Sequence, residues 1–162
     1  MSLINTFNVG AFIKAKTAVV NTAITQSSAA LATTQDGVTI DRNAAGLRRY
    51  YSCKAIVSGV FVGATTAKSA TLLLNVQHSS DGTSWDNYST GTAPAAVTLG
   101  PTSNSTNGTE YGTIEQSVNL NGARRYLRVQ IPPTVYSDCS SGSAFTGHGV
   151  IVFGGADELP AQ

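Results

Sequence analysis

Few residues of this chain could act as catalysts. His78 and His148 are the only histidines among the 162 residues. No Gly-x-Ser-x-Gly elbow surrounds a serine that either histidine could activate. Glycoside hydrolysis needs two carboxylates that face one groove at a set separation. The nine acidic residues show no such pairing, and Asp81 is better explained as a turn residue beside Gly82. We therefore predict that the protein is not an enzyme.

The sequence also offers no cofactor or metal site. Asp81, Asp86 and Asn87 could touch a cation, but their spacing does not match the twelve-residue calcium loop. Cys53 and Cys139 lie far apart and match no zinc or redox spacing. We interpret them as free thiols, with Cys53 buried in a strand, and leave open a disulfide formed after release from the cell. No cofactor is predicted.

Arginines form two groups in the sequence, and each group flanks a turn. The first group is Arg42, Arg48 and Arg49, and the second is Arg124, Arg125 and Arg128. They are either solvated strand ends or groups that pair with carboxylates of a partner subunit, where the guanidinium fork is favoured. The net charge of only +1 argues against nucleic acid as a partner, because phosphate binding needs a concentrated basic face.

The strongest predicted strand covers residues 50–62. Its apolar residues alternate with polar ones, which is typical of a half-buried strand, and Gly59 inside it indicates a bulge. Similar alternation predicts strands over residues 70–76, 111–120, 124–131 and 148–153. The pairs Asp81-Gly82 and Asn121-Gly122 predict hairpins, because glycine adopts a positive φ at little cost.

These signals predict an all-β protein. We expect an antiparallel two-sheet sandwich, jelly-roll-like, with about eight strands. Residues 1–35 are predicted to form an extended N-terminal arm with one strand near 17–25, residues 36–155 the sandwich, and residues 156–162 a C-terminal tail. With 41% hydrophobic residues the chain should fold. No stretch resembles a membrane span or a signal peptide, so we expect synthesis in a cytoplasm and no membrane partner.

Three segments resemble one known class of proteins. They are QHSSDGTSW at 77–85, VNLNGARRYLRV at 118–129 and VFGGADELP at 152–160. Over residues 50–160 the chain is similar to head decoration, or cement, proteins of tailed bacteriophages. The resemblance implies a homotrimer on the outside of a phage capsid that clamps neighbouring major capsid proteins. It also implies that the protein is located in the virion after synthesis in the host cytoplasm.

Under this interpretation we expect the capsid contacts to be Phe7, Phe12 and Ile13 of the arm together with Arg48 and Arg49. A tail or baseplate component is an alternative within the same gene clusters. A second alternative, from another class, is a carbohydrate-binding module that stacks a glycan on aromatic rings. Its platform would consist of Trp85, Tyr88, Tyr111 and Tyr126.

Overall fold

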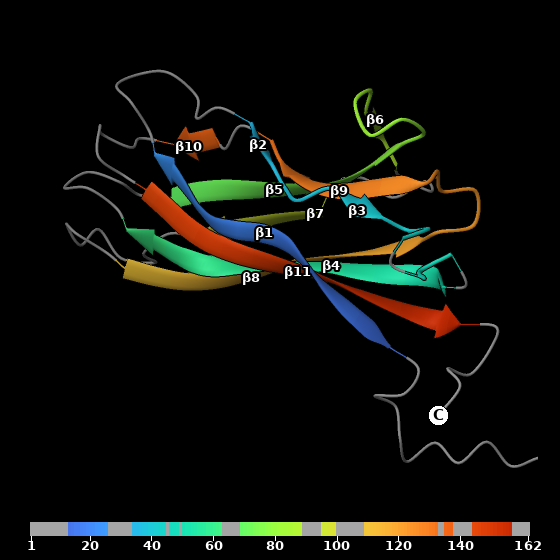
Figure 1. The fold of residues 1–162 in the computed structure, drawn as a ribbon. Coiled ribbons are helices and arrows are strands. Elements are labelled where there is room, and N and C mark those ends of the chain that lie inside the picture. The colour runs from blue at the N-terminus through green and yellow to red at the C-terminus, as the bar shows by residue number, and fades with distance from the viewer. Residues whose placement is uncertain are drawn as a thin grey trace, which may run out of the picture.

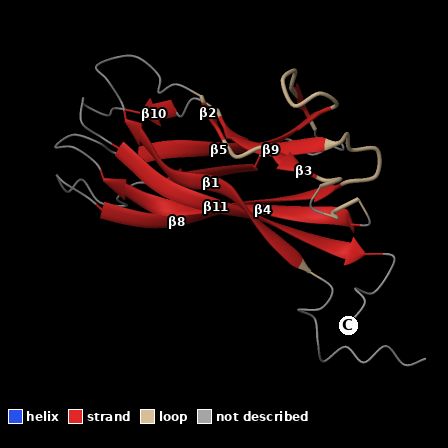
Figure 2. Ribbon diagram, in the orientation of Figure 1, coloured by secondary structure: helices blue, strands red, loops and turns tan. Residues whose placement is uncertain are grey.

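The fold is known from a computed structural model in which part of the chain is described. The described residues are 13–25, 34–44, 46–48, 50–62, 69–88, 95–99, 109–132, 135–137 and 144–156. Within them every regular element is a strand (Figure 2). The strands are β1 (Lys14–Thr25), β2 (Gln35–Asp36), β3 (Ile40–Asp41), β4 (Tyr50–Val62), β5 (Ser69–Ser79), β6 (Asp86–Asn87), β7 (Ala95–Leu99), β8 (Thr109–Asn119), β9 (Tyr126–Ile131), β10 (Val135–Ser137) and β11 (Ala144–Ala156).

Two antiparallel sheets face each other (Figure 1). The four-stranded sheet has the order β1-β11-β4-β8 and consists of long strands. The seven-stranded sheet consists of shorter segments centred on β5 and β9. On one side of β5, β10 and β9 pair with successive stretches of that strand in nearly the same register. On its other side β7 and β6 pair with successive stretches of β5, but their registers differ by five residues. β2 and β3 share the free side of β9.

The eleven segments therefore follow eight strand lines, four in each sheet. In the second sheet the order of lines is β2/β3, β9/β10, β5 and β6/β7. Together with β1-β11-β4-β8, this is the order of a jelly roll, in which two Greek keys wrap around one core. The prediction of an all-β, two-sheet, jelly-roll-like sandwich is confirmed.

The core lies between the sheets, where the inward-facing residues of each strand meet. Phe61, Phe145 and Phe153 are its largest fully buried side chains. Two glycines make room for one of these rings, because a Cβ added at Gly59 or Gly147 would lie 2.5 or 2.6 Å from atoms of Phe145. Gly59 keeps an unbroken register with both neighbouring strands, so the predicted bulge is wrong. Instead, the missing side chain of Gly59 allows the Phe145 ring to lie close to the backbone of β4.

Asn121-Gly122 forms a turn, and Gly122 has a φ of 91°. The hairpin predicted there is wrong, because β8 belongs to the four-stranded sheet and β9 to the other. Leu120 is buried, and its N–H donates to the carbonyl of Tyr51 at 2.7 Å, which holds the end of β8 against β4. The chain then crosses between the layers. A favoured turn dipeptide fixes the local bend but not which strands pair across it.

The hairpin at Asp81-Gly82 is confirmed, with a longer loop than a two-residue turn. His78 pairs with Asp86, and β5 ends at Ser79, so the residues from Ser80 to Trp85 form the loop. The Asp81 carboxylate organises it by accepting N–H bonds from Thr83 and Ser84, each at 2.8 Å. These backbone donors hold the pKa of Asp81 well below its usual range. Asp81 is thus a loop-capping residue.

β1 gives part of the predicted arm a defined place. It pairs antiparallel with β11 along its length and forms the edge of the four-stranded sheet. Ala18 and Val19 of this strand belong to the buried core. The N–H of Val38 donates to Ala18 at 2.7 Å and that of Gly37 donates to Val129 at 2.8 Å, which ties this edge to the second sheet. Residues 1–12 lie outside the described part.

Candidate interaction surface

Three segments meet at one end of the sandwich, and Arg42 connects them through hydrogen bonds. They are the β3–β4 loop, which carries Arg42, the crossover from β8 to β9, and the first residue of β4. Arg42 Nη1 donates to the carbonyls of Ala123 at 2.7 Å and Arg124 at 3.3 Å, and Nη2 donates to that of Tyr50 at 3.4 Å. Arg42 is only 6% exposed. A buried cation with carbonyl partners alone bears an unbalanced charge.

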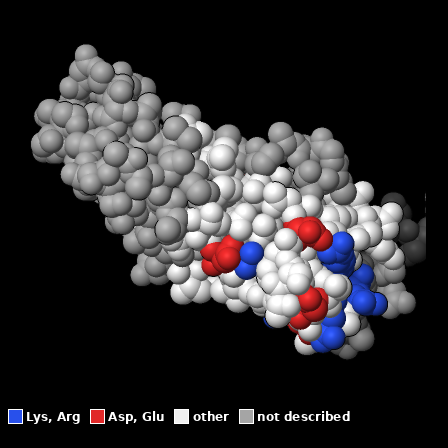
Figure 3. Space-filling model, turned by 90° about the horizontal axis from the view of Figure 1, so that it is seen from above, with Lys and Arg blue, Asp and Glu red and all other residues white. Residues whose placement is uncertain are grey.

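Exposed ion pairs surround this end. Arg125 binds Asp41 with both Nε and Nη2, at 3.1 and 2.6 Å to the two carboxylate oxygens, and this contact lowers the pKa of Asp41 to about 2. Arg124 pairs with Asp86 in the same region. Figure 3 looks onto the seven-stranded sheet and shows most of the visible basic residues gathered at the right of the view beside acidic residues, while most of the remaining described surface of this face is uncharged.

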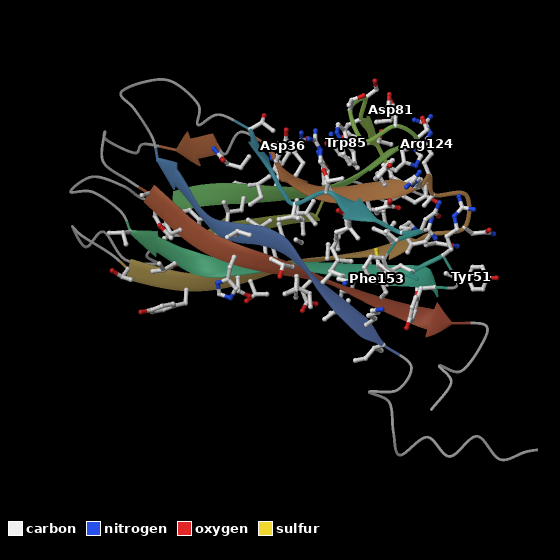
Figure 4. The ribbon with its side chains drawn as sticks, viewed as in Figure 1. Asp36, Tyr51, Asp81, Trp85, Arg124 and Phe153 are labelled. Carbon is white, nitrogen blue, oxygen red and sulfur yellow. The ribbon has the colours of Figure 1, made fainter. Side chains whose placement is uncertain are left out.

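A second arginine cluster lies on the outer face of the seven-stranded sheet. Arg128 Nε donates to Gln77 at 2.8 Å, its Nη1 pairs with Asp36 at 3.0 Å, and its Cζ lies 4.4 Å from the centroid of the Trp85 ring. Figure 4 shows Asp36 and Trp85 above this sheet. Amide side chains complete the cluster, because Gln77 Nε2 donates to Asn87 and to Gln130, and Gln130 donates to Asp36. We call this the Arg128 network, comprising Asp36, Gln77, Trp85, Asn87, Arg128 and Gln130.

A basic pocket of about 550 Å³ lies beside Arg42. Its described lining residues are Lys14, Arg42, Asn43, Gly46 and Arg48. Within the described part of the chain, neither Arg42 nor Arg48 has a carboxylate partner. The Nε atom of Arg42 is buried and makes no hydrogen bond. Burial first, and then the nearby charge of Arg48, lowers the pKa of Arg42.

The contact residues predicted from the sequence are only partly placed. Phe7, Phe12 and Arg49 lie outside the described residues. Ile13 is 46% exposed and directly precedes Lys14, which lines the basic pocket together with Arg48. The structure thus brings Ile13 and Arg48 to one end of the sandwich. Arg42 was in the same sequence group but was not predicted as a contact, because no local signal shows that an arginine is buried.

The four aromatic residues of the glycan platform do not share a face. Trp85 stacks on Arg128, the Tyr88 ring lies 4.5 Å from the His78 ring, and the Tyr88 hydroxyl donates to Asn121. Tyr111 stands on β8 in the opposite sheet, ten residues before Asn121, which amounts to roughly 30 Å of extended strand. These residues cannot form a single stacking surface.

The outer face of the four-stranded sheet has a different character. It carries a shallow depression of about 490 Å³ whose rim includes Tyr111, 84% exposed, and His148. Ser58 and Thr113 hydrogen-bond across its floor at 2.9 Å. Hydroxyl groups, aromatic rings and glycines line this depression, and its described lining includes no Lys, Arg, Asp or Glu.

The thiol of Cys53 is buried and unreactive. Cys53 is a free thiol in the core, and burial raises its pKa to about 12, so it stays protonated. Its proposed partner Cys139 lies outside the described residues. Among the residues described, no three His, Cys, Asp or Glu side chains come close enough to hold a metal ion. No helix of sufficient length and apolarity to span a membrane occurs in the same part of the chain.

Comparisons with known proteins give only distant structural likenesses. No family model matches the chain, and no curated protein matches it. Eiger TNF from S. frugiperda aligns over 93% of this chain and 98% of its own, with 11% identity and a TM-score of 0.37. A chain of infectious bursal disease virus, Gx strain, aligns over 87% of this chain and 41% of its own, with 12% identity and a TM-score of 0.28. The VP2 subviral particle of that virus aligns over 88% of this chain and 40% of its own, with 16% identity and a TM-score of 0.25. These values assign neither a function nor a partner.

Proposed function

We propose that this protein is a structural component of a phage virion. It binds the outside of the capsid as a homotrimer and stabilises the shell by clamping neighbouring major capsid proteins. The proposal rests on the resemblance of residues 50–160 to phage decoration proteins. The jelly-roll sandwich is compatible with this role, because a rigid β-scaffold can present one end to a partner.

One observation carries the proposal. Ile13 and Arg48, the described members of the expected contact set, are both exposed and lie at the same end of the sandwich. An apolar side chain beside arginines is the composition favoured in specific interfaces. Three such ends in one trimer would bind a repeating shell with an avidity that one end lacks.

Deletion of the N-terminal arm tests the proposal, and the start of β1 at Lys14 determines which residues can be removed without loss of strand pairing. A truncation through residue 16 would remove three residue pairs between β1 and β11, whereas deletion of residues 2–12 leaves β1 complete. The truncated and full-length proteins are sedimented with capsids assembled without this chain. The deletion should abolish co-sedimentation and leave the far-ultraviolet β-signal unchanged. Capsid binding equal to that of the full chain would refute the role of the arm.

A matched control removes the other end of the chain, residues 157–162, and should bind like the full protein. The homotrimer is tested separately by the mass in solution, which should be about 50 kDa, three times 16.7 kDa. Immunolabelling of virions distinguishes the head from the tail or baseplate alternative. The glycan alternative has lost its single platform of four aromatic residues, because Tyr111 lies on the opposite sheet.

A further inference from the structure

The two arginines of the basic pocket differ from the other described arginines in lacking a described carboxylate partner. Arg124, Arg125 and Arg128 each have an aspartate partner, and Lys54 pairs with Glu115 at 2.5 Å. Arg42 and Arg48 have none in the described part of the chain, and both line the same pocket. Two like charges held side by side repel each other, so an anion placed between them is attracted by both.

The buried position of Arg42 strengthens that attraction. Its guanidinium uses Nη1 and Nη2 on carbonyl oxygens, while the buried Nε retains an N–H with no acceptor. Carbonyl groups satisfy hydrogen bonds but leave the full positive charge without a counter-charge. A charge removed from water is costly unless it is paired. A ligand that brings a negative charge to this pocket therefore relieves a cost that already exists in the unbound protein.

The pocket walls are also held in place before any ligand arrives. Leu47 is fully buried, and its N–H donates to the carbonyl of Arg42 at 2.7 Å. Asp41 accepts the N–H of Asn43 at 2.9 Å, and Gly46 adopts a φ of 64° that favours glycine. Lining residues that are already held by such bonds lose little conformational entropy when a ligand binds.

We propose that the basic pocket is a carboxylate-binding site, and that an acidic side chain of the capsid partner occupies it. The inference rests on the proposed function for the source of the carboxylate. Planar carboxylates match the fork of a guanidinium group, and Arg48 is exposed and free to complete the contact. The chain's own Asp157 and Glu158 follow Ala156, which pairs with Tyr50, so they are a second source that the experiment must separate.

The first arm of the test uses the isolated protein and citrate as the probe. The Nε–H signal of Arg42 is followed by NMR at constant ionic strength, in the full chain and in a variant that ends at Ala156. Citrate should shift this signal in both proteins. Arg48→Gln should weaken citrate binding about three- to fivefold, the effect of losing one exposed charge partner. Arg124→Gln removes the same charge outside the pocket and should change nothing.

Two results overturn the site. One is an Arg42 signal that citrate does not move in either protein, and the other is an equal weakening by Arg48→Gln and Arg124→Gln. A response that appears only in the variant ending at Ala156 assigns the pocket to the chain's own acidic tail and overturns the partner's role. Amide spectra of both glutamine variants should match those of the parent protein, which excludes misfolding as the cause.

The second arm repeats capsid co-sedimentation with Arg48→Gln and Arg124→Gln. Arg48→Gln should weaken capsid binding at least as strongly as it weakens citrate binding, because a trimer multiplies the effect of each site. If Arg48→Gln binds capsids normally while deletion of residues 2–12 abolishes binding, the proposed function stands and the carboxylate site in the interface is refuted. If citrate binds as expected but the full chain does not bind capsids, the pocket stands and the proposed function is refuted.

Discussion

Arg128 and Arg42 are both largely shielded arginines on one jelly roll, yet their surroundings differ in kind. Arg128 has a carboxylate, an amide acceptor and an indole ring as neighbours. Arg42 has three carbonyl oxygens, a buried Nε without an acceptor, and a second cation close by. The Arg128 network contains its own carboxylate, whereas Arg42 and Arg48 of the basic pocket have no carboxylate partner among the described residues.

This difference separates arginines that maintain the fold from arginines that are available to a partner. A network whose donors and acceptors are paired stabilises the sheet that carries it and gains little from a ligand. A pocket with unbalanced positive charge contributes less to folding than it could, and an anion from outside can recover that contribution. Removing Arg128 should therefore mainly lower stability, and removing Arg48 should mainly lower anion binding. Arg42 has both roles, because it lines the pocket and also joins three segments of the fold.

Arg42→Met should produce the largest loss of stability. Methionine fills similar space but cannot donate to the carbonyls of Ala123, Arg124 and Tyr50, so the contacts between three segments disappear. We expect the free energy of unfolding to fall by about 2 to 3 kcal/mol. Urea unfolding followed by Trp85 fluorescence measures it. A variant as stable as the parent protein would show that the buried charge offsets everything these hydrogen bonds contribute.

Arg128→Met should lower the free energy of unfolding by about 1 to 2 kcal/mol, because it removes an ion pair, a hydrogen bond and a ring contact together. The matched control is Arg124→Met, which breaks a single exposed pair and should cost about 0.5 kcal/mol or less. Equal losses in the two variants would mean that the Arg128 network has no more structural importance than a surface ion pair. Capsid binding should survive both changes.

Acid should weaken the balanced pair of Asp41 and Arg125 in a defined window. The pKa of Asp41 is lowered from its ordinary value to about 2, so its stabilising contribution is complete above the unfolded pKa near 4 and is lost as the pH falls through 2. The difference in unfolding free energy between the parent protein and Asp41→Asn should therefore shrink between pH 5 and pH 2. Urea titrations across this range test it, and a difference that stays constant would contradict the assignment.

Arg48→Gln should have the smallest effect on stability, in the favourable direction. Arg48 is exposed, has no carboxylate partner in the described part, and adds a repulsive charge near Arg42. Its removal should leave the free energy of unfolding unchanged or raise it by about 0.5 kcal/mol at low salt. A clear loss of stability would show that Arg48 maintains the fold, as Arg128 does.

The sequence was sufficient to predict most of the long strands, but it did not predict the short strand β10 or which strands pair with each other. Alternation correctly indicated which residues of β4, β8 and β9 face the core, because period two follows directly from strand geometry. It did not indicate that β8 and β9 belong to different sheets, although Asn121-Gly122 joins them. Pairing depends on contacts between residues far apart in the chain, and a local dipeptide carries no information about them.

The candidate site was predictable only at the level of residue type. Two arginine groups could be seen in the sequence, and partner carboxylates were one of two interpretations. Arg124, Arg125 and Arg128 each have an aspartate partner across the fold, whereas Arg42 and Arg48 have none among the described residues. Those aspartates lie 38 to 92 positions away in the sequence, Asp86 from Arg124 being the nearest and Asp36 from Arg128 the farthest. Charge balance is a property of the folded arrangement.

The most direct test of an unbalanced, anion-binding pocket is the change in unfolding free energy on adding citrate at constant ionic strength, compared between the parent protein and Arg48→Gln. The parent protein should gain about 1.4 kcal/mol once citrate exceeds its dissociation constant about tenfold, because the anion binds only the folded pocket. Arg48→Gln should gain distinctly less at the same citrate concentration. Equal gains in the two proteins, or none in either, would contradict the assignment of the pocket.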